Sequence, residues 1–489
     1  MVVDPPYAST ASPSDLMVLD LLYDGLTRLA PDGTAAPAVA TGWSADPGQR
    51  VWRFTLDTNA RFTTDRAVLA ADVVASLQHV MAGGDASPAA VRLEPVAGFR
   101  AYVDGTSPTV SGLQVVDDHT VEITLDTPLA QLPVLLAAPS YGVVDVPGLA
   151  SVAAGGSGTT LPGSATPAEL RTLGLTGSWS VGDAGERLVR LDRRPGAVGH
   201  LDAVELRPYE DDAAAFAAFE DEDVDWAPVP GDRYGEAVDA YGSDAFAPFA
   251  AELHLGLRVD GPVLSNPDLR KAIALALDRQ AIIDAVYPEE ATVLEGIVPT
   301  SLSPGRTDHG AIAQDVRQAL ALVRGAFPDG RVPTVHLDFE ATTATAALMA
   351  IVARSLDDVG IPTELRPLAL DAYQRLLVSG AQEVFTLSWL GGYASPSAYL
   401  DPLLRSSSPD NLLGLRDAGL DAALDAARAT GDLAVAEQHW SNVERTALGA
   451  AFLIPIAEFR TQVVVADRVL HLRHALDGTV DWSAVEVAS

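Results

Sequence analysis

Residues 334–367 have the sequence TVHLDFEATTATAALMAIVARSLDDVGIPTELRP, which contains a strand, a helix and a second strand in succession. Apolar residues alternate over 334–339 and recur at helical spacing over 342–359, and a second extended stretch follows at 362–367. Parallel strands need a long connection, usually a helix, so this order is typical of a βαβ unit. The segment therefore predicts an α/β fold.

The same mixture of strands and helices continues in both directions along the chain, and no repeat of fixed period is present. We expect strands at 51–56, 121–125, 188–191, 204–207, 253–259, 383–389 and 463–466, and helices at 15–29, 72–81, 213–219, 315–327, 419–429 and 433–447. A further helix is expected to begin at Asn266, a good N-cap followed by Pro267, and to extend through Ile283.

The composition limits the classes of protein to which this chain can belong. Among 489 residues, 66 are acidic and 32 are basic, so the formal net charge is −34 at pH 7. Such a negative surface repels phosphate backbones, and we expect no nucleic-acid partner. Cysteine is absent and Lys271 is the only lysine, so a Walker loop, a Schiff base or a Ser-Lys dyad would have to use Lys271, which follows no glycine-rich loop. We expect no cofactor and no metal.

The sequence contains no apolar run near the length of about 20 residues that spans a bilayer, and we expect a soluble chain. Its N-terminus has neither a basic start nor a long apolar stretch, so no signal peptide is predicted. However, residues 2–5 have the character of a strand end entering a loop. We therefore expect a further segment to precede the sequence.

Short strings between about residues 23 and 455 carry a resemblance to a known family. In chain order they are 21–26 (LLYDGL), 32–33 (DG), 37–43 (PAVATGW), 52–56 (WRFTL), 61–62 (RF), 70–77 (AADVVASL), 176–179 (TGSW), 223–226 (DVDW), 266–273 (NPDLRKAI) and 278–279 (DR). Together they resemble the family 5 extracellular solute-binding proteins, the oligopeptide, dipeptide and nickel receptors of ABC importers.

This resemblance implies a two-lobe clamshell of the type II periplasmic-binding-protein kind, with an additional domain inserted in the N-terminal lobe. It also implies a monomeric receptor outside the cytoplasmic membrane, lipid-anchored through the segment that precedes this sequence. Such a receptor captures a peptide-like or other small polar solute in the cleft between its lobes and delivers it to ABC permease subunits in the membrane. A cleft that closes on its ligand also removes the polar contacts from water.

The resemblance implies a ligand site within 387–396, LSWLGGYASP. In peptide-binding members the corresponding segment resembles a pattern of tryptophan, two variable residues, aspartate and an aromatic residue. There the extended backbone pairs with the ligand, and the aspartate meets the α-ammonium group. The ligand-binding residues implied here are Ser388, Trp389, Leu390, Gly391, Gly392 and Tyr393.

Trp389 keeps the aromatic residue, whereas Gly392 stands where the aspartate would be. An ammonium group that leaves water needs an opposite charge nearby, so the glycine disfavours a free peptide N-terminus at this point. We expect a blocked, cyclic, modified or non-peptide solute, or a peptide in a shifted register. Asp401 and Asp410 are the nearest acids downstream, and we expect both to lie beyond the cleft loop, on a helix or the turn after it.

Other interpretations stay open at this point. Trp389 can be an ordinary buried aromatic residue followed by a turn. The chain can be a hydrolase or transferase with scattered catalytic residues, although it has no Gly-x-Ser-x-Gly elbow and no His-Glu-x-x-His helix, or a regulatory clamshell. His471 and His474 lie three residues apart, but two imidazoles without a third ligand are weak evidence for a metal. We expect no catalytic residues and no metal site.

The glycine- and serine-rich stretch 153–166 and the order of the family strings predict three structural units. Residues 1–48, 165–252 and 466–489 form one lobe, residues 49–164 form the inserted domain, and residues 253–465 form the second lobe. Each boundary is placed to within roughly ten residues.

Overall fold

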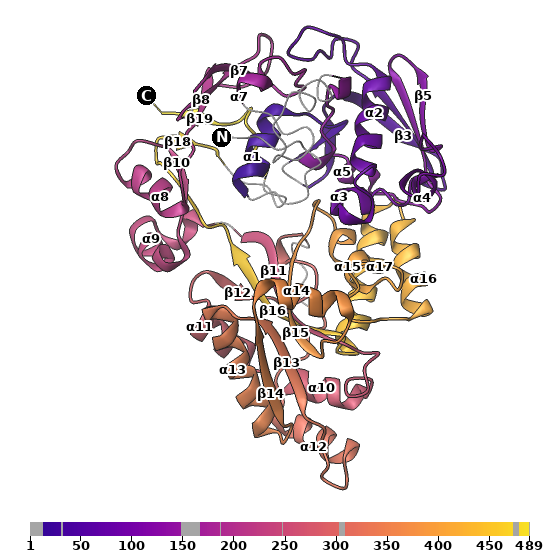
Figure 1. The fold of residues 1–489 in the computed structure, drawn as a ribbon, viewed down its shortest axis with the longest axis vertical. Helices are drawn as coiled ribbons and strands as arrows, with labels where there is room; N and C mark the ends of the chain where they lie inside the picture. The colour runs from indigo at the N-terminus through magenta and orange to yellow at the C-terminus, as the bar shows by residue number, and fades with distance from the viewer. Residues whose placement is uncertain are drawn as a thin grey trace.

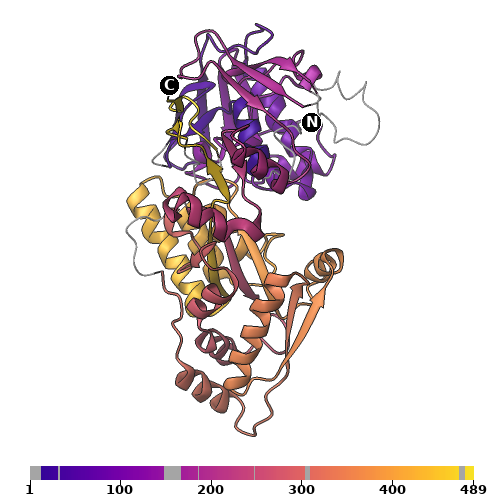
Figure 2. The same cartoon turned by 90° about the vertical axis from the view of Figure 1, so that its left-hand side faces the viewer.

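The computed structural model describes residues 13–30, 33–147, 167–185, 187–246, 248–302, 309–472 and 479–488. These residues form two lobes, one above the other in Figure 1 and again in the perpendicular view of Figure 2. We call residues 13–246 with 463–488 the upper lobe and residues 248–460 the lower lobe. The chain therefore passes from one lobe to the other twice.

The lower lobe is built on one six-stranded sheet with the order β12-β16-β11-β15-β13-β14. Its strands are β11 (Pro248–Leu257), β12 (Ala291–Val293), β13 (Val335–Glu340), β14 (Thr363–Leu368), β15 (Val384–Leu390) and β16 (Leu453–Arg460). β13 is parallel to both β14 and β15, and α13 (Thr343–Asp358) connects β13 to β14. This is the strand-helix-strand unit predicted at 334–367, and it is confirmed.

Helices cover both faces of this sheet because successive side chains of a strand point to opposite faces. Val384 of β15 packs in the core with α10 (Pro267–Ala276), α11 (Arg279–Val286), α12 (Val316–Ala326) and α13. Phe385 and Leu387 pack in the other core, with α15 (Ser397–Leu404), α16 (Ala418–Arg428) and α17 (Leu433–Gly449). This second core continues into the upper lobe, so the two lobes share apolar contacts on this side. The remaining helical segments are α14 (Leu370–Ser379) and η5 (Thr300–Leu302).

The upper lobe contains several smaller sheets. A four-stranded sheet has the order β3-β4-β6-β5, from β3 (Ala40–Ala45), β4 (Val51–Leu56), β5 (Leu113–Asp117) and β6 (Thr120–Thr124), and a three-stranded sheet consists of β7 (Trp179–Ala184), β8 (Val189–Arg193) and β9 (Ala203–Leu206). Short pairs are formed by β1 (Thr27–Leu29) with β2 (Ala35–Pro37) and by β18 (Val469–Leu470) with β19 (Glu486–Val487). The helical segments are α1 (Pro13–Leu22), α2 (Ala70–Met81), η1 (Gly84–Ala86), α3 (Pro88–Val91), α4 (Phe99–Val103), α5 (Leu132–Leu135), η2 (Pro139–Tyr141), α7 (Pro167–Leu170), α8 (Asp212–Glu220), η3 (Gly231–Arg233), α9 (Tyr234–Tyr241) and η4 (Ser243–Ala245).

The two passages of the chain between the lobes lie side by side. β10 (Trp226–Pro228) pairs antiparallel with β17 (Val463–Val465) just above the junction, and β11 pairs antiparallel with β16 just below it. Between these pairs, Val229 N donates to Gln462 O at 2.8 Å, and Arg460 Nη1 donates to Phe246 O at 3.3 Å. The junction is thus a double connection held by main-chain hydrogen bonds and by one hydrogen bond from the Arg460 side chain.

The three predicted structural units stay a prediction. The predicted boundary between residues 48 and 49 falls in the connection of the antiparallel β3–β4 pair, and the boundary between 252 and 253 falls inside β11. The stretch 153–166 lies outside the described residues.

Two predicted helices are wrong in extent. The helix expected at 15–29 ends at Leu22, because the chain turns at Gly25, where a Cβ atom would lie 2.5 Å from Leu136 O, and then forms β1. The helix expected from Asn266 through Ile283 is two helices, α10 and α11. The break occurs because Asp278 accepts a hydrogen bond from Ala281 N at 3.0 Å and caps α11 as a new helix.

The N-cap of α10 yields a stability prediction. The Asn266 side chain accepts hydrogen bonds from Asp268 N at 2.9 Å and Leu269 N at 3.4 Å. Asn266→Ala leaves these donors without that partner, and we expect a loss of about 1 kcal/mol of stability, measured by urea unfolding. Asn266→Asp is the control and should stay within about 0.5 kcal/mol of the native protein because aspartate caps equally well. Equal losses in both variants would contradict the capping role.

Candidate functional site

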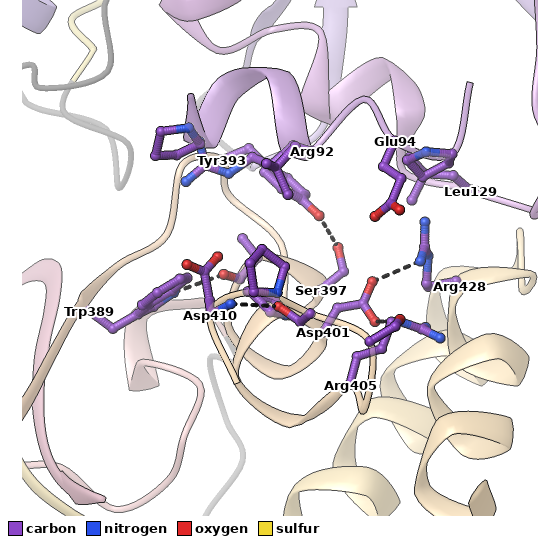
Figure 3. A pocket seen from close by; sticks show the side chains of 18 residues that line it. Arg92, Glu94, Leu129, Trp389, Tyr393, Ser397, Asp401, Arg405, Asp410 and Arg428 are labelled. Atoms are coloured by element: carbon purple, nitrogen blue, oxygen red, sulfur yellow. Dashed lines mark hydrogen bonds and ion pairs between the residues drawn. The ribbon is translucent and has the colours of Figure 1, made fainter. Parts of the chain in front are cut away.

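A pocket lies at the junction of the two lobes (Figure 3). Its upper wall comes from α3 with the residues that follow it, 88–95, and from Leu129. Its lower wall comes from the end of β15, from α15 and the loop 407–410, and from Arg428. The cavity volume is about 100 Å³, which is room for several water molecules or one end group of a ligand. In this arrangement of the lobes it is a subsite for part of a ligand.

The end of β15 lies at this junction with one edge open. β15 pairs with β11 along its whole length, from Leu257↔Val384 to Ala251↔Leu390. On its other edge it pairs with β13 only at Val384 and Phe385. The Tyr373 hydroxyl donates to Thr386 O at 2.5 Å, so a side chain covers the edge at that point. Beyond Thr386, no strand in the described part of the chain pairs with this edge, and its main-chain groups are available to an extended ligand.

Two of the six predicted site residues line the pocket. Trp389 is half-buried, and its indole Nε1 donates to Ala398 O at 2.9 Å, which fixes the orientation of the ring. Tyr393 is buried, and its hydroxyl hydrogen-bonds to the Ser397 hydroxyl at 2.7 Å. Trp389 also packs at the margin of the shared core, so the structure contains both the aromatic wall and the packing contact.

The other four predicted residues lie on the same segment but outside the pocket lining. Ser388 and Leu390 are exposed. A Cβ atom at Gly391 would overlap the ring of Tyr399, so this position is packed from within the lower lobe. Nothing in the structure tests whether these residues contact a ligand, and the six-residue site stays a prediction.

Gly392 has a neighbour that the sequence did not indicate. A Cβ atom at this position would overlap the guanidinium group of Arg92, which descends from the end of α3 in the upper lobe. The guanidinium group of Arg92 therefore occupies the space that a side chain at position 392 would need. Arg92 lies about 300 residues away in the sequence, so only the fold brings the two together.

The two acids expected beyond the cleft loop lie where predicted, on a helix and on the turn after it, but both also line the pocket, which the sequence did not indicate. Asp401 lies on α15, as expected, but it accepts ion pairs from Arg405 Nε at 2.6 Å and from Arg428 Nη1 at 2.9 Å. Asp410 lies on the loop after α15 and is half-buried. Burial raises the pKa of Asp410 above its usual value, and the nearby charge of Arg92 acts in the opposite direction.

A metal site needs clustered ligand side chains, and a membrane-spanning helix needs a long apolar stretch. No group of three or more His, Asp or Glu side chains in the described ranges is arranged to hold a metal ion. His471 is exposed, and His474 lies outside the described residues. Over the same ranges, every helix is too short or too polar to cross a lipid bilayer.

Comparison with known proteins identifies relatives along most of the chain. Residues 34–411 match the family described as bacterial extracellular solute-binding proteins, family 5. The periplasmic oligopeptide-binding protein OppA of Escherichia coli strain K12 is 24% identical over 405 residues, which cover 79% of this chain and 72% of that protein.

Solved structures share the fold over nearly the whole chain. The unliganded open form of the periplasmic murein tripeptide binding protein MppA has a TM-score of 0.83 at 20% identity, covering 99% of this chain and 95% of that one. Haemophilus influenzae OppA in complex with RPPGFSPFR has a TM-score of 0.73 at 16% identity, covering 100% and 98%. The fold therefore superimposes better on the open form than on this peptide complex. The predicted fold class, an α/β clamshell of the type II periplasmic-binding-protein kind, is confirmed.

The ion pairs of Asp401 yield a second stability prediction. Its carboxylate holds two guanidinium groups, and the three side chains are only 10–18% exposed. Asp401→Asn removes the ion-pair partner of Arg428 and leaves Arg405 only the exposed Asp425, and we expect a loss of about 2 kcal/mol in a urea unfolding experiment. The matched control is Asp425→Asn, because Asp425 pairs with Arg405 at 2.9 Å but is 57% exposed. It should lose at most about 1 kcal/mol, and equal losses in the two variants would rule out a structural role for Asp401.

Proposed function

This chain belongs to the bacterial extracellular solute-binding proteins of family 5, and on that premise we propose that it captures a peptide or peptide-like solute and delivers it to an ABC permease. The observation that carries the proposal is the open edge at the end of β15, where Trp389 also lines a pocket between the two lobes. The resemblance found in the sequence is confirmed by the family match, and the chain acts outside the cytoplasm.

The named relatives support a peptide as the cargo. The Escherichia coli relative is an oligopeptide-binding protein, and the unliganded structure is that of a murein tripeptide binding protein. An extended peptide satisfies its backbone hydrogen bonds when it adds to an open strand edge, and its side chains then point alternately toward and away from the sheet. The backbone beyond Thr386 offers such an edge, and the fixed ring of Trp389 provides an apolar wall beside it.

We further propose that ligand binding closes the lobes about the double connection at β10–β17 and β11–β16. The better superposition on an unliganded open form supports an open resting state. In the proposed division, residues 1–48, 165–252 and 466–489 form one lobe, residues 49–164 form the inserted domain, and residues 253–465 form the other lobe. Closure would bring Arg92 and Leu129 of the upper lobe against the ligand held by the lower lobe.

The same proposal includes the oligomeric state, the absence of catalysis and the attachment to the cell surface. The receptor acts as a monomer, catalyses no reaction, and is held at the cell surface by a lipid anchor. The relatives support a binding role because they are named as binding proteins. The alternatives are a hydrolase or transferase with scattered catalytic residues and a regulatory clamshell.

Incubation with a mixed peptide digest tests this function directly. We expect a subset of peptides to copurify with the protein and to be recovered intact by mass spectrometry. A bound peptide at 100 times its Kd should stabilise the native state by about 2.7 kcal/mol, and X-ray scattering should show a smaller radius of gyration because the lobes close.

Three outcomes would contradict the proposal. Cleaved peptides would show a hydrolase, and the absence of any bound peptide would exclude a receptor for ordinary α-linked peptides. A captured peptide that changed neither the melting temperature nor the radius of gyration would exclude the closing mechanism.

Trp389 yields a prediction about affinity. Trp389→Ala removes the aromatic wall of the pocket, and we expect it to weaken binding of a captured peptide by about 1–3 kcal/mol in calorimetry. The matched control is Trp43→Ala, because Trp43 lies on β3 in the upper lobe at the margin of the same core. If Trp389→Ala left the affinity within twofold of the native value, Trp389 would be a packing residue only.

A further inference from the structure

Two side chains in the inter-lobe pocket carry opposite charges that lack ion-pair partners. Arg92 comes from the upper lobe and Asp410 from the lower lobe, and both line the pocket (Figure 3). Among the described residues, no carboxylate lies within 4.0 Å of the Arg92 guanidinium and no basic group lies that close to the Asp410 carboxylate. Each is half-buried, so each charge has lost part of its hydration.

The other charged side chains of the pocket are already matched. Asp401 pairs with Arg405 and Arg428, as described above. Glu94 also lines the pocket, with its carboxylate directed toward the lower wall (Figure 3), and it pairs with Arg100 at 2.9 Å. The pocket therefore presents one unmatched cation and one unmatched anion to whatever enters it.

Arg92 is held where it stands. Its guanidinium group packs against Gly392, where a Cβ atom would lie too close to Arg92 Cζ and would require the guanidinium group to shift. It also acts on the buried Tyr141 hydroxyl, whose pKa burial raises and the Arg92 charge and hydrogen bond lower. A ligand cation therefore cannot occupy the space beside Gly392, because it would meet the positive charge of Arg92.

Asp410 lies on the other side of the same space. Its carboxylate stands beside the ring of Trp389 and is directed up toward the upper lobe (Figure 3). Its pKa is raised chiefly by burial and lowered by the nearby Arg92, so the two groups already act on each other across the pocket. A ligand group between them would meet a negative charge below and a positive charge above.

We propose that this pocket recognises an α-amino acid end whose ammonium and carboxylate groups are both free, with the ammonium on Asp410 and the carboxylate on Arg92. This proposal rests on the proposed function and names the chemical class of its cargo. An arginine fork binds a carboxylate through two parallel hydrogen bonds, and an ammonium group removed from water needs a carboxylate. The cavity volume of about 100 Å³ suits one such end group.

An ordinary peptide does not offer this arrangement at its N-terminus, because the first α-carboxyl group is part of the peptide bond. A peptide joined through a side-chain carboxyl group does offer it. Such a cargo is a modified peptide bound with its ammonium group away from position 392. It therefore agrees with the expectation drawn from Gly392.

Two isomeric dipeptides provide the probes. γ-L-glutamyl-L-alanine leaves ammonium and carboxylate on one carbon, whereas α-L-glutamyl-L-alanine has the same atoms and the same net charge but separates these groups. We expect the native protein to bind the γ-linked isomer at least tenfold more tightly in calorimetry. Asp410→Asn and Arg92→Gln should each reduce this preference to less than threefold, and Arg92→Lys should keep part of it because the charge remains.

Two matched control variants each remove one charge, negative or positive, at a position outside the pocket. Asp239→Asn on α9 and Arg317→Gln on α12 change exposed side chains outside the pocket, and both should retain the full preference. Melting temperatures of all variants show whether each one is folded. If a variant is unfolded, Asp410→Glu and Arg92→Lys provide the second test, and each should shift the isomer preference by at least threefold.

Each remaining outcome would overturn the inference. Equal affinity for the isomers, no binding of the γ-linked isomer, or an unchanged preference in folded Asp410→Asn and Arg92→Gln would overturn the inference. The last result, together with a changed radius of gyration in the unliganded variants, would show that Arg92 and Asp410 close on each other instead. If the protein binds neither the γ-linked isomer nor any peptide from the mixed digest, the proposed function fails as well, whereas capture of digest peptides with equal affinity for the two isomers overturns the inference alone.

Discussion

The antiparallel pairing of β11 with β15 determines where a ligand site can form in this protein. β11 begins at Pro248, directly below the upper lobe, and continues down into the lower sheet. An antiparallel partner runs the opposite way, so the last residues of β15 must lie opposite the first residues of β11. The register Glu252↔Trp389 and Ala251↔Leu390 therefore brings the end of β15 to the junction between the lobes. A register shift of one residue would turn Trp389 to the other face of the sheet.

Buried polar contacts hold this part of β11 in place. Glu252 and His254 are fully buried and hydrogen-bond at 2.9 Å between Glu252 Oε2 and His254 Nε2. Burial raises the pKa of Glu252 well above its usual value, with further increases from the nearby Glu458 and Glu444, and it lowers the pKa of His254 to about 3. Burial thus favours the neutral form of both groups, and a hydrogen bond between neutral groups avoids the cost of burying two charges. Glu444 on α17 accepts hydrogen bonds from two main-chain N–H groups of a neighbouring loop, Ile297 and Val298, and attaches that loop to the helix.

Local sequence patterns predicted most of this fold because they depend on neighbouring residues. Alternation and helical spacing located β13, α13 and β14 to within one residue, and the Asn266 cap marked the start of α10. The errors came where tertiary contacts overrule spacing. The leucines of 15–29 keep helical spacing past Leu22, but Gly25 packs against the main chain of Leu136 and the helix stops. Likewise, the motif around Trp389 located one wall of the pocket, whereas Arg92 has no sequence signal because its partner is distant in the chain.

The overall charge makes the isolation of Arg92 informative. With 66 acidic and 32 basic residues, about two carboxylates are available for every cation, so an arginine in this protein should readily find an acidic neighbour. Arg405, Arg428 and Arg100 all do so around the same pocket. A half-buried cation without such a neighbour costs free energy that a single acidic substitution nearby would recover. At Gly392 that substitution would be an aspartate directly against Arg92, the residue type that the family pattern has there. An aspartate would neutralise Arg92 within the protein, whereas glycine leaves the guanidinium group free to bind a ligand anion.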